Sequence, residues 1–140
     1  MEKNSTLIVV VAVALIRDDG CVLMQRRRFG GMHGGLWEFP GGKVKPLETA
    51  EQALIREIGE ELGISLGVSD LAPLAFASDP AQLPAPREPY VILLYRCRKW
   101  RGEPRCLEGE AIGWFARDEL PGLAKPPLDV PLVEALLRVI

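Results

Sequence analysis

Three glutamates lie close together near the middle of the chain: Glu57, Glu60 and Glu61. Spacings of three and four residues place all three on one face of a helix. Carboxylates arranged in this way can hold a divalent cation, and hard oxygen ligands without a nearby His or Cys favour Mg²⁺ or Mn²⁺. Charged helix residues also commonly face water. Spacing alone therefore leaves two interpretations, a metal site and a solvated acidic face.

The position of these glutamates on the predicted helix favours the metal site. Like charges four residues apart repel, which disfavours Glu57 beside Glu61. The negative end of the helix dipole disfavours Glu60 and Glu61 in the last turn. On a helical wheel Glu61 falls about 20° from Leu54, on the apolar side, where a carboxylate needs an ion pair or a cation.

The helix that carries the glutamates is predicted over residues 49–62. Thr49 and Gln52 have the spacing of a capping box at its start, and Gly63 is a stop signal at its end. An apolar stripe recurs every fourth residue, at Ala50, Leu54, Ile58 and Leu62. These signals place the carboxylates on a helix that must pack against a core.

The segment before this helix has the composition of a phosphate-binding loop. Gly41 and Gly42 allow a ligand to approach the backbone closely. Five cations flank the same region: Arg26, Arg27, Arg28, Lys43 and Lys45. Mg²⁺ usually binds through a few carboxylates together with substrate phosphates, so the loop and the helix together suggest a polyphosphate substrate.

Composition limits the class of protein. The chain has 140 residues, 48% of them hydrophobic, which predicts one globular domain over residues 1–140. A net charge of −2 argues against a protein that coats nucleic acid. The three scattered cysteines, Cys21, Cys97 and Cys106, indicate neither a disulfide framework nor a zinc site, and we expect a cytoplasmic location.

The N-terminal apolar run, residues 7–16, follows Lys3 and loosely resembles a signal peptide. It is too short to span a membrane, is rich in Val, and ends in a turn sequence at Asp18-Asp19-Gly20. We therefore interpret residues 7–17 as a core strand, pair it in a hairpin with a strand at 21–26, and expect no association with a membrane.

The remaining elements are predicted from periodicity and turn residues. A short strand at Trp37-Glu38-Phe39 should stop at Pro40-Gly41-Gly42. Further strands are expected at 71–77, 90–97 and 111–115, with loops at 27–36, 78–89 (Pro80, Pro84, Pro86 and Pro89), 100–103 and 121–127. A final helix should cover 129–140, with Asp129 as its N-cap. This order predicts a mixed α/β fold.

The loop and helix together resemble the signature of a known family, the Nudix hydrolases. Every fixed position of the Nudix box, G-x5-E-x7-R-E-U-x-E-E-x-G-U with U a bulky apolar residue, is matched by Gly42, Glu48, Arg56-Glu57-Ile58, Glu60-Glu61 and Gly63-Ile64. Flanking segments at 36–43, 100–104 and 126–131 are similar to MutT-type enzymes. The resemblance implies the Nudix fold, a mixed β-sheet sandwiched between α-helices.

The resemblance also implies roles for the residues of the box. Glu57, Glu60 and Glu61 become metal ligands or catalytic carboxylates, and the carbonyl of Gly41 becomes a further ligand. Gly42, Glu48 and Arg56 are implied to be structural, with Arg56 pairing with Glu48. Glu108 resembles a late acidic residue that approaches the metal or acts as a base; Glu110 competes for that role, and both could instead be solvated loop residues.

Substrate contacts are implied at other positions. Arg27 matches an arginine that contacts phosphate or sugar, and the segment Glu38, Phe39, Pro40 and Gly41 would line the nucleoside pocket. Asp129 takes the place of a base-reading Asn, and ionised Asp only accepts hydrogen bonds, so base preference could differ unless Asp129 is protonated. Met32 replaces another base-neighbouring residue, a His, and His33 is interpreted as a bystander.

The implied reaction is Mg²⁺-dependent hydrolysis of a nucleoside triphosphate to a monophosphate and pyrophosphate. Our first hypothesis is action on 8-oxo-dGTP; CTP or another pyrimidine triphosphate is the alternative. ADP-ribose hydrolysis is disfavoured, and so is a non-catalytic nucleotide-binding module, because the carboxylate set is complete. The resemblance does not say which carboxylate is the general base, and it leaves open a monomer or a homodimer.

Overall fold

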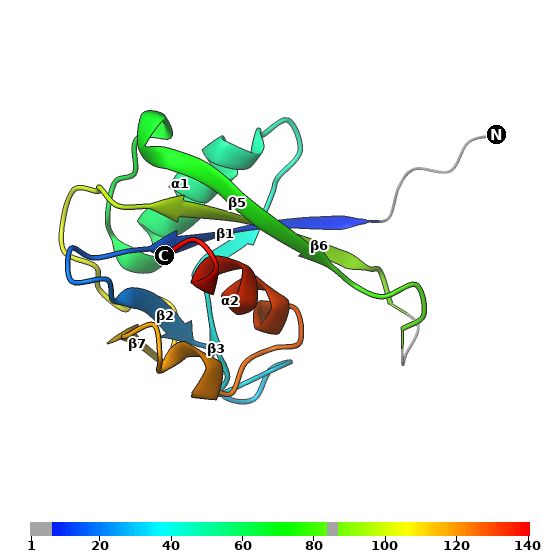
Figure 1. Ribbon diagram of the computed structural model, residues 1–140. Helices are drawn as coiled ribbons and strands as arrows, with labels where there is room; N and C mark the ends of the chain where they lie inside the picture. Colours follow the sequence, from blue (N-terminus) through cyan, green and yellow to red (C-terminus); the bar gives the residue numbers. More distant parts are fainter. Residues whose placement is uncertain (1–6, 84–86) are drawn as a thin grey trace.

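The computed structural model describes residues 7–83 and 87–140, and its centre is a four-stranded sheet with one α-helix on each face (Figure 1). A smaller three-stranded sheet lies beside it. Lys3 of the signal-peptide comparison and two of the loop prolines, Pro84 and Pro86, fall outside the described residues. The predicted layering of a mixed sheet between helices is confirmed.

The larger sheet is mixed, as its pairings show. Its strands, in spatial order, are β4 (Gly41–Lys43), β1 (Ile8–Leu15), β6 (Tyr90–Cys97) and β5 (Leu71–Ser78). β1 and β6 run parallel, whereas β1–β4 and β5–β6 are antiparallel. The strands predicted at 71–77 and 90–97 are therefore confirmed, the first with one extra residue.

The smaller sheet corrects the predicted hairpin. Its strands are β3 (Trp37–Glu38), β2 (Val22–Arg26) and β7 (Ala111–Phe115), all antiparallel. The turn at Gly20 does form, and Ile16 and Val22 make a single bridge. Beyond that bridge β2 leaves β1 for β3 and β7, because both edges of β1 are already occupied by β4 and β6. Of the hairpin predicted from residues 7–17 and 21–26, only the turn and this one bridge form, and the two strands belong to different sheets.

The strand predicted at 37–39 does stop before Pro40, but the two glycines that follow form a strand of their own, which was not predicted. The segment predicted to end a strand forms β4, with Gly41 opposite Ala12 and Gly42 opposite Val11. A Cβ added at Gly41 would lie 1.9 Å from the Val11 carbonyl oxygen, so only glycine allows this approach. The glycines therefore permit a close strand pairing here, which sequence rules interpret as a break.

Helix α1 (Ala50–Leu62) has the predicted ends. The Thr49 hydroxyl accepts from the Gln52 N–H at 3.1 Å, and the Gln52 side chain accepts from the Thr49 N–H at 2.9 Å. Gly63 ends the helix in the left-handed conformation, with φ 70°. The apolar stripe is buried except for Ala50, which is half-buried.

The C-terminal helix, α2 (Asp129–Leu137), is shorter than predicted. Its N-cap is Leu128, which offers no side-chain cap, so the prediction that Asp129 caps the helix was wrong. Two 3₁₀ turns, η1 (Val68–Asp70) and η2 (Leu120–Gly122), complete the fold. Asp129 is instead turned toward the loop before β4.

Both faces of β1 are buried, which explains its unbroken apolar sequence. Alternate side chains belong to two clusters: Val11, Val13 and Leu15 pack with α1, and Ala12, Ala14 and Ile16 pack with α2. Across residues 7–83 and 87–140, no helix is long and apolar enough to cross a membrane. β1 thus fixes the position of α1 and, through it, of the glutamates.

Candidate active site

Arg56 ties strand β4 and the loop after it to helix α1. Its guanidinium binds both oxygens of Glu48, with Nε donating to Oε2 at 2.7 Å and Nη2 to Oε1 at 2.9 Å. Nη2 also donates to the Lys43 carbonyl at 3.1 Å. The hydrogen bond with Arg56, aided by one from the Lys45 N–H, lowers the pKa of Glu48 to about 2. The pair joins β4, the following loop and the helix into one unit.

Glu57 and Glu60 share the same guanidinium. Arg56 Nη1 lies 2.8 Å from Glu57 Oε1 and 3.5 Å from Glu60 Oε2. The Glu57 carboxylate also lies against the backbone of Gly42, where an added Cβ would be 2.3 Å from Glu57 Cδ. Glycine at 42 therefore leaves the space that the carboxylate occupies.

Glu61 has a different environment, although it is next in sequence. It is only 6% exposed, and its Oε1 accepts from Gln25 Nε2 at 2.9 Å. Glu61 Oε2 and Gln25 Oε1 are buried and have no hydrogen-bond partner among the described residues. Burial, opposed by the Gln25 hydrogen bond and reinforced by the Glu57, Glu38 and Glu108 carboxylates, raises the pKa of Glu61 to about 8.

A hollow of about 270 Å³ opens beside Glu61. It is lined by Gln25, Arg27, Arg28, Phe29, Gly31, Met32, Glu38, Glu61, Glu108 and Gly109. It brings together four of the residues implied by the family resemblance, from four different segments. Of the two late acidic candidates, Glu108 lines the hollow and Glu110 does not.

Hydrogen bonds and an ion pair hold Arg27 and Arg28 in place beside the hollow. Arg27 Nη1 pairs with Glu38 Oε1 at 3.0 Å, and Arg27 Nε donates to the Met32 carbonyl at 3.1 Å. Arg28 Nε donates to the carbonyl of Glu108. Burial raises the pKa of Glu38, while Arg27 opposes the shift. The two arginines thus connect the loop at 27–36 to Glu38 and to the Glu108 loop.

The three glutamates of the helix do not form a preformed metal site. In the parts of the chain that the structure describes, no three Asp, Glu, His or Cys side chains converge closely enough to hold a metal ion. Glu57 and Glu60 face Arg56, whereas Glu61 faces Gln25. The oxygen atoms present nevertheless fit a hard cation, because one buried oxygen of Glu61 and one of Gln25 have no hydrogen-bond donor among the described residues.

Gln25 is a site residue that the sequence analysis missed. It is 4% exposed and is the only polar residue among the first four of β2, Val22 to Gln25. A polar side chain in an otherwise apolar strand was the available signal. Its partner Glu61 lies 36 residues away, so the sequence could not indicate the pairing.

Asp129 reaches the site from the far end of the chain. Its side chain is buried, and Oδ2 accepts from the Phe39 N–H at 3.1 Å. Burial raises the pKa of Asp129 to about 7; Glu38 adds to the shift, and the Phe39 N–H opposes it. Asp129 is therefore fixed to the Glu38-Phe39-Pro40 segment, although it does not line the 270 Å³ hollow.

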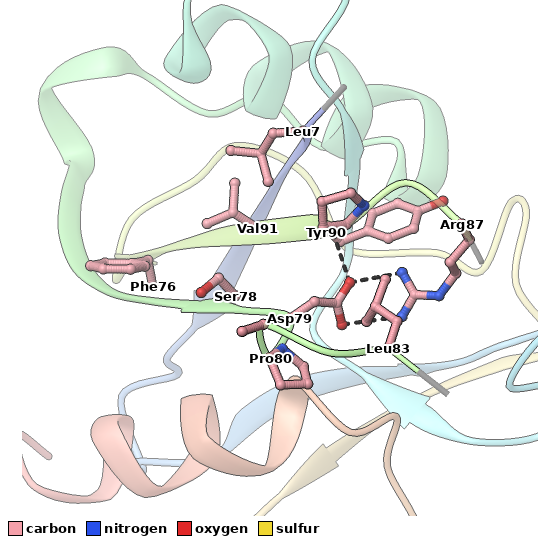
Figure 2. A pocket seen from close by; sticks show the side chains of 11 residues that line it. Leu7, Phe76, Ser78, Asp79, Pro80, Leu83, Arg87, Tyr90 and Val91 are labelled. Carbon is pink, nitrogen blue, oxygen red and sulfur yellow. Dashed lines mark hydrogen bonds and ion pairs between the residues drawn. The ribbon is translucent and has the colours of Figure 1, made fainter. Parts of the chain in front are cut away.

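A larger hollow, of about 790 Å³, lies by the β5–β6 connection (Figure 2). Arg87 pairs there with Asp79 at 2.7 Å, and the Tyr90 N–H donates to the same carboxylate. None of the residues implied to bind metal or substrate lines it. Size alone therefore does not mark the candidate site, which is identified by its titratable groups.

Comparison with known proteins agrees with this arrangement. The NUDIX domain family matches residues 6–136. A CTP pyrophosphohydrolase of Escherichia coli K12 is 34% identical over 92% of this chain and 91% of its own. An 8-oxo-dGTP diphosphatase of Haemophilus influenzae is 34% identical over 94% of this chain and 93% of its own.

Solved structures agree with the sequence comparison. The solution structure of the E. coli ORF135 protein superimposes with a TM-score of 0.82 at 31% identity, covering 96% of this chain and 91% of that one. A MutT NUDIX hydrolase from Burkholderia pseudomallei gives 0.76 at 36% identity, covering 96% and 98%. The chain belongs to the Nudix hydrolase family. Within that family its relatives place it in the MutT-like group of pyrophosphohydrolases, which generally use a divalent metal ion.

Proposed function

We propose that this enzyme hydrolyses a nucleoside triphosphate with one water to a nucleoside monophosphate and pyrophosphate, and that 8-oxo-dGTP is its substrate. The observation that carries the proposal is the environment of Glu61. One of its oxygens is held by Gln25, the other is buried without a partner in the described structure, and both residues open onto a hollow with two arginines. Such a site suits a divalent cation carrying a polyphosphate.

The metal ligands in this proposal are Glu57, Glu60, Glu61, Glu108 and the carbonyl of Gly41. Bound Mg²⁺, or Mn²⁺, would neutralise charge on the phosphates and lower the pKa of the attacking water. Arg27 and Arg28 contribute positive charge for the phosphates from the side of the hollow. One of the four glutamates takes the proton from the water as it attacks phosphorus.

Asp129 is compatible with an oxidised purine as the substrate. With a pKa of about 7, its carboxyl carries a proton in a large fraction of molecules at neutral pH. A protonated carboxyl both donates and accepts, as an Asn amide does. The imidazole edge of 8-oxoguanine presents an N7–H donor beside the O6 acceptor, so protonated Asp129 can complement both. A protonated Asp129 thus offers the paired donor and acceptor that an ionised Asp lacks.

CTP is the second candidate, favoured by the relative named CTP pyrophosphohydrolase. Cytosine presents the N4 amino donor beside the N3 acceptor, which a protonated Asp129 could also complement. The hydrogen-bonding argument therefore does not separate the two bases. We infer that free nucleotides are the substrates, because the net charge of −2 does not suit a nucleic acid polymer.

The test is pyrophosphate release with Mg²⁺ across a panel that contains dGTP, 8-oxo-dGTP, CTP, dCTP and ADP-ribose. We expect the highest kcat/KM for 8-oxo-dGTP; a preference for CTP would select the alternative. Glu61→Gln should lower kcat by roughly 100-fold or more, the range expected for loss of a metal ligand or general base, without a loss of folding. Near-normal turnover in that variant would contradict the proposed site, and no release from any nucleotide by the wild type would favour a binding module.

A further inference from the structure

Gln25 lies between the two acidic parts of the candidate site. It is on β2, the middle strand of the smaller sheet, where it is paired with Glu38 of β3 and Ile112 of β7. Its side chain is 4% exposed and contacts Glu61 in the last turn of α1. Because Gln25 belongs to one sheet and Glu61 to a helix on the other, this contact joins the two halves of the fold at the carboxylate.

The donors and acceptors of the two side chains account for the orientation of the Gln25 amide. A Glu61 that holds a cation is ionised and can only accept, so the Gln25 group that faces it is the NH₂ donor, as the structure has it. In the opposite orientation Gln25 Oε1 would face Glu61 Oε1, and two acceptors would meet with no hydrogen between them. The observed orientation leaves Gln25 Oε1 and Glu61 Oε2 buried and without partners in the described part of the chain. Two acceptors that lack a donor at one place call for a positively charged or proton-donating partner.

The Glu108 loop also rests on Gln25. A Cβ added at Gly109 would lie 2.7 Å from Gln25 Cγ and 2.9 Å from the Arg26 carbonyl oxygen. Gly109 therefore lets the loop pack directly on the Gln25 side chain, one residue beyond Glu108. Gln25 thus touches Glu61 by a hydrogen bond and the neighbour of Glu108 by packing.

We propose that Gln25 is a positioning residue of the metal site: it holds Glu61 Oε1 and so leaves Glu61 Oε2 directed for a divalent cation. The proposal rests on the metal-dependent hydrolysis proposed above. Partners of this kind fix the orientation of a ligand and typically contribute about 10- to 100-fold to metal affinity or activity. The fold itself does not need the amide, since an apolar side chain would suit this buried strand position.

The direct test is a titration of the nucleotide-free protein with Mn²⁺, in which the electron paramagnetic resonance signal measures the unbound ion. Gln25→Leu removes the donor and keeps a similar volume, and we expect Mn²⁺ to bind about 10-fold or more weakly. Met24→Leu is the matched control, because Met24 is a buried neighbour on the same strand that packs in the α2 cluster. It should bind Mn²⁺ like the wild type.

A double-mutant cycle assigns the effect to Glu61. Glu61→Gln should weaken Mn²⁺ binding, and adding Gln25→Leu to it should weaken binding little further. With nucleotide, Gln25→Leu should lower kcat about 10- to 100-fold while KM changes by less than about threefold. If circular dichroism shows that Gln25→Leu does not fold, Gln25→Asn, which keeps the amide but shortens its reach, replaces it.

The outcomes separate this inference from the proposed function. Wild-type Mn²⁺ affinity in folded Gln25→Leu, additive effects in the cycle, or no Mn²⁺ binding by the wild type would each overturn the role of Gln25. Pyrophosphate release by the wild type and Met24→Leu, with unchanged Mn²⁺ binding in Gln25→Leu, would leave the function standing and remove only this inference. Weak Mn²⁺ binding in Gln25→Leu supports it even if no tested nucleotide is hydrolysed.

Discussion

Asp129, the first residue of helix α2, accepts a hydrogen bond at 3.1 Å from the backbone N–H of Phe39, 90 residues earlier in the chain. The bond connects the C-terminal helix to the segment that leads into the Nudix box. It also explains why the helix lacks a side-chain cap, since the only carboxylate at its start is used elsewhere. This one contact places a titratable group beside the proposed nucleoside pocket.

The first prediction concerns the pH dependence of stability. The pKa of Asp129 is raised from 3.8 to about 7, so the fold disfavours the ionised form. Its contribution to stability is complete below about pH 4 and is lost as pH rises toward 7. Relative to Asp129→Asn, the free energy of unfolding of the wild type should fall by about 2–3 kcal/mol between pH 5 and pH 8, at about 1.4 kcal/mol per pKa unit.

Urea unfolding at the two pH values measures this difference. Glu61 also has a raised pKa, but it titrates in both proteins and cancels in the comparison. Glu134→Gln, which changes an exposed carboxylate on the same helix, should keep the wild-type pH dependence. A difference between wild type and Asp129→Asn that does not vary with pH would show that Asp129 is not buried as described.

The second prediction separates the two adjacent glycines. Gly41→Ala would place Cβ 1.9 Å from the backbone oxygen of Val11, so we expect a loss of stability of about 1–3 kcal/mol or more. Gly42→Ala would meet the Glu57 carboxylate, which can move, so activity should fall far more than stability. Gly122→Ala, with nothing within 4 Å, should change neither. Thermal unfolding and pyrophosphate release on all three variants check this, and equal behaviour at 41 and 42 would refute it.

The third prediction concerns Arg56, which we expect to act through structure. Arg56→Gln loses the two-point contact with Glu48 and the bond to the Lys43 carbonyl, so the melting temperature and the activity should both fall. Arg56→Lys should keep only part of the wild-type melting temperature and activity, because an ammonium group cannot replace the two-point contact of the planar guanidinium. Arg17→Gln breaks an exposed ion pair with Asp19 and should have little effect on either. Full activity in Arg56→Gln would argue against the role.

The fourth prediction distinguishes Glu108 from Glu110. Of these two glutamates, only Glu108 lines the hollow beside Glu61. Glu108→Gln should therefore lower kcat about 10- to 100-fold, at the lower end of acid–base or ligand effects, and Glu110→Gln should leave it near the wild-type value. Steady-state kinetics on the preferred nucleotide decides between them. The reverse pattern would assign the role to Glu110 and show that the loop is arranged differently in the working enzyme.

The features that the sequence determined are local ones. The capping box, the Gly63 stop and the apolar stripe fix α1 through contacts within four residues, and they put Glu61 on the buried side of the helix. The spacing of the Nudix box then gave the family, which the comparisons confirm. Short-range hydrogen bonds and helical periodicity are written in neighbouring residues, so they can be interpreted without a fold.

The tertiary structure decided which distant residues meet. β1 has two edges, and once β4 and β6 fill them β2 must join another sheet, which puts Gln25 against Glu61. The same packing turns Asp129 away from its own helix and toward Phe39. These contacts span 36 and 90 residues, and their formation depends on the competition of whole strands and helices for the same core. No local pattern encodes that competition, and so the three glutamates were predictable while the partner of the buried one was not.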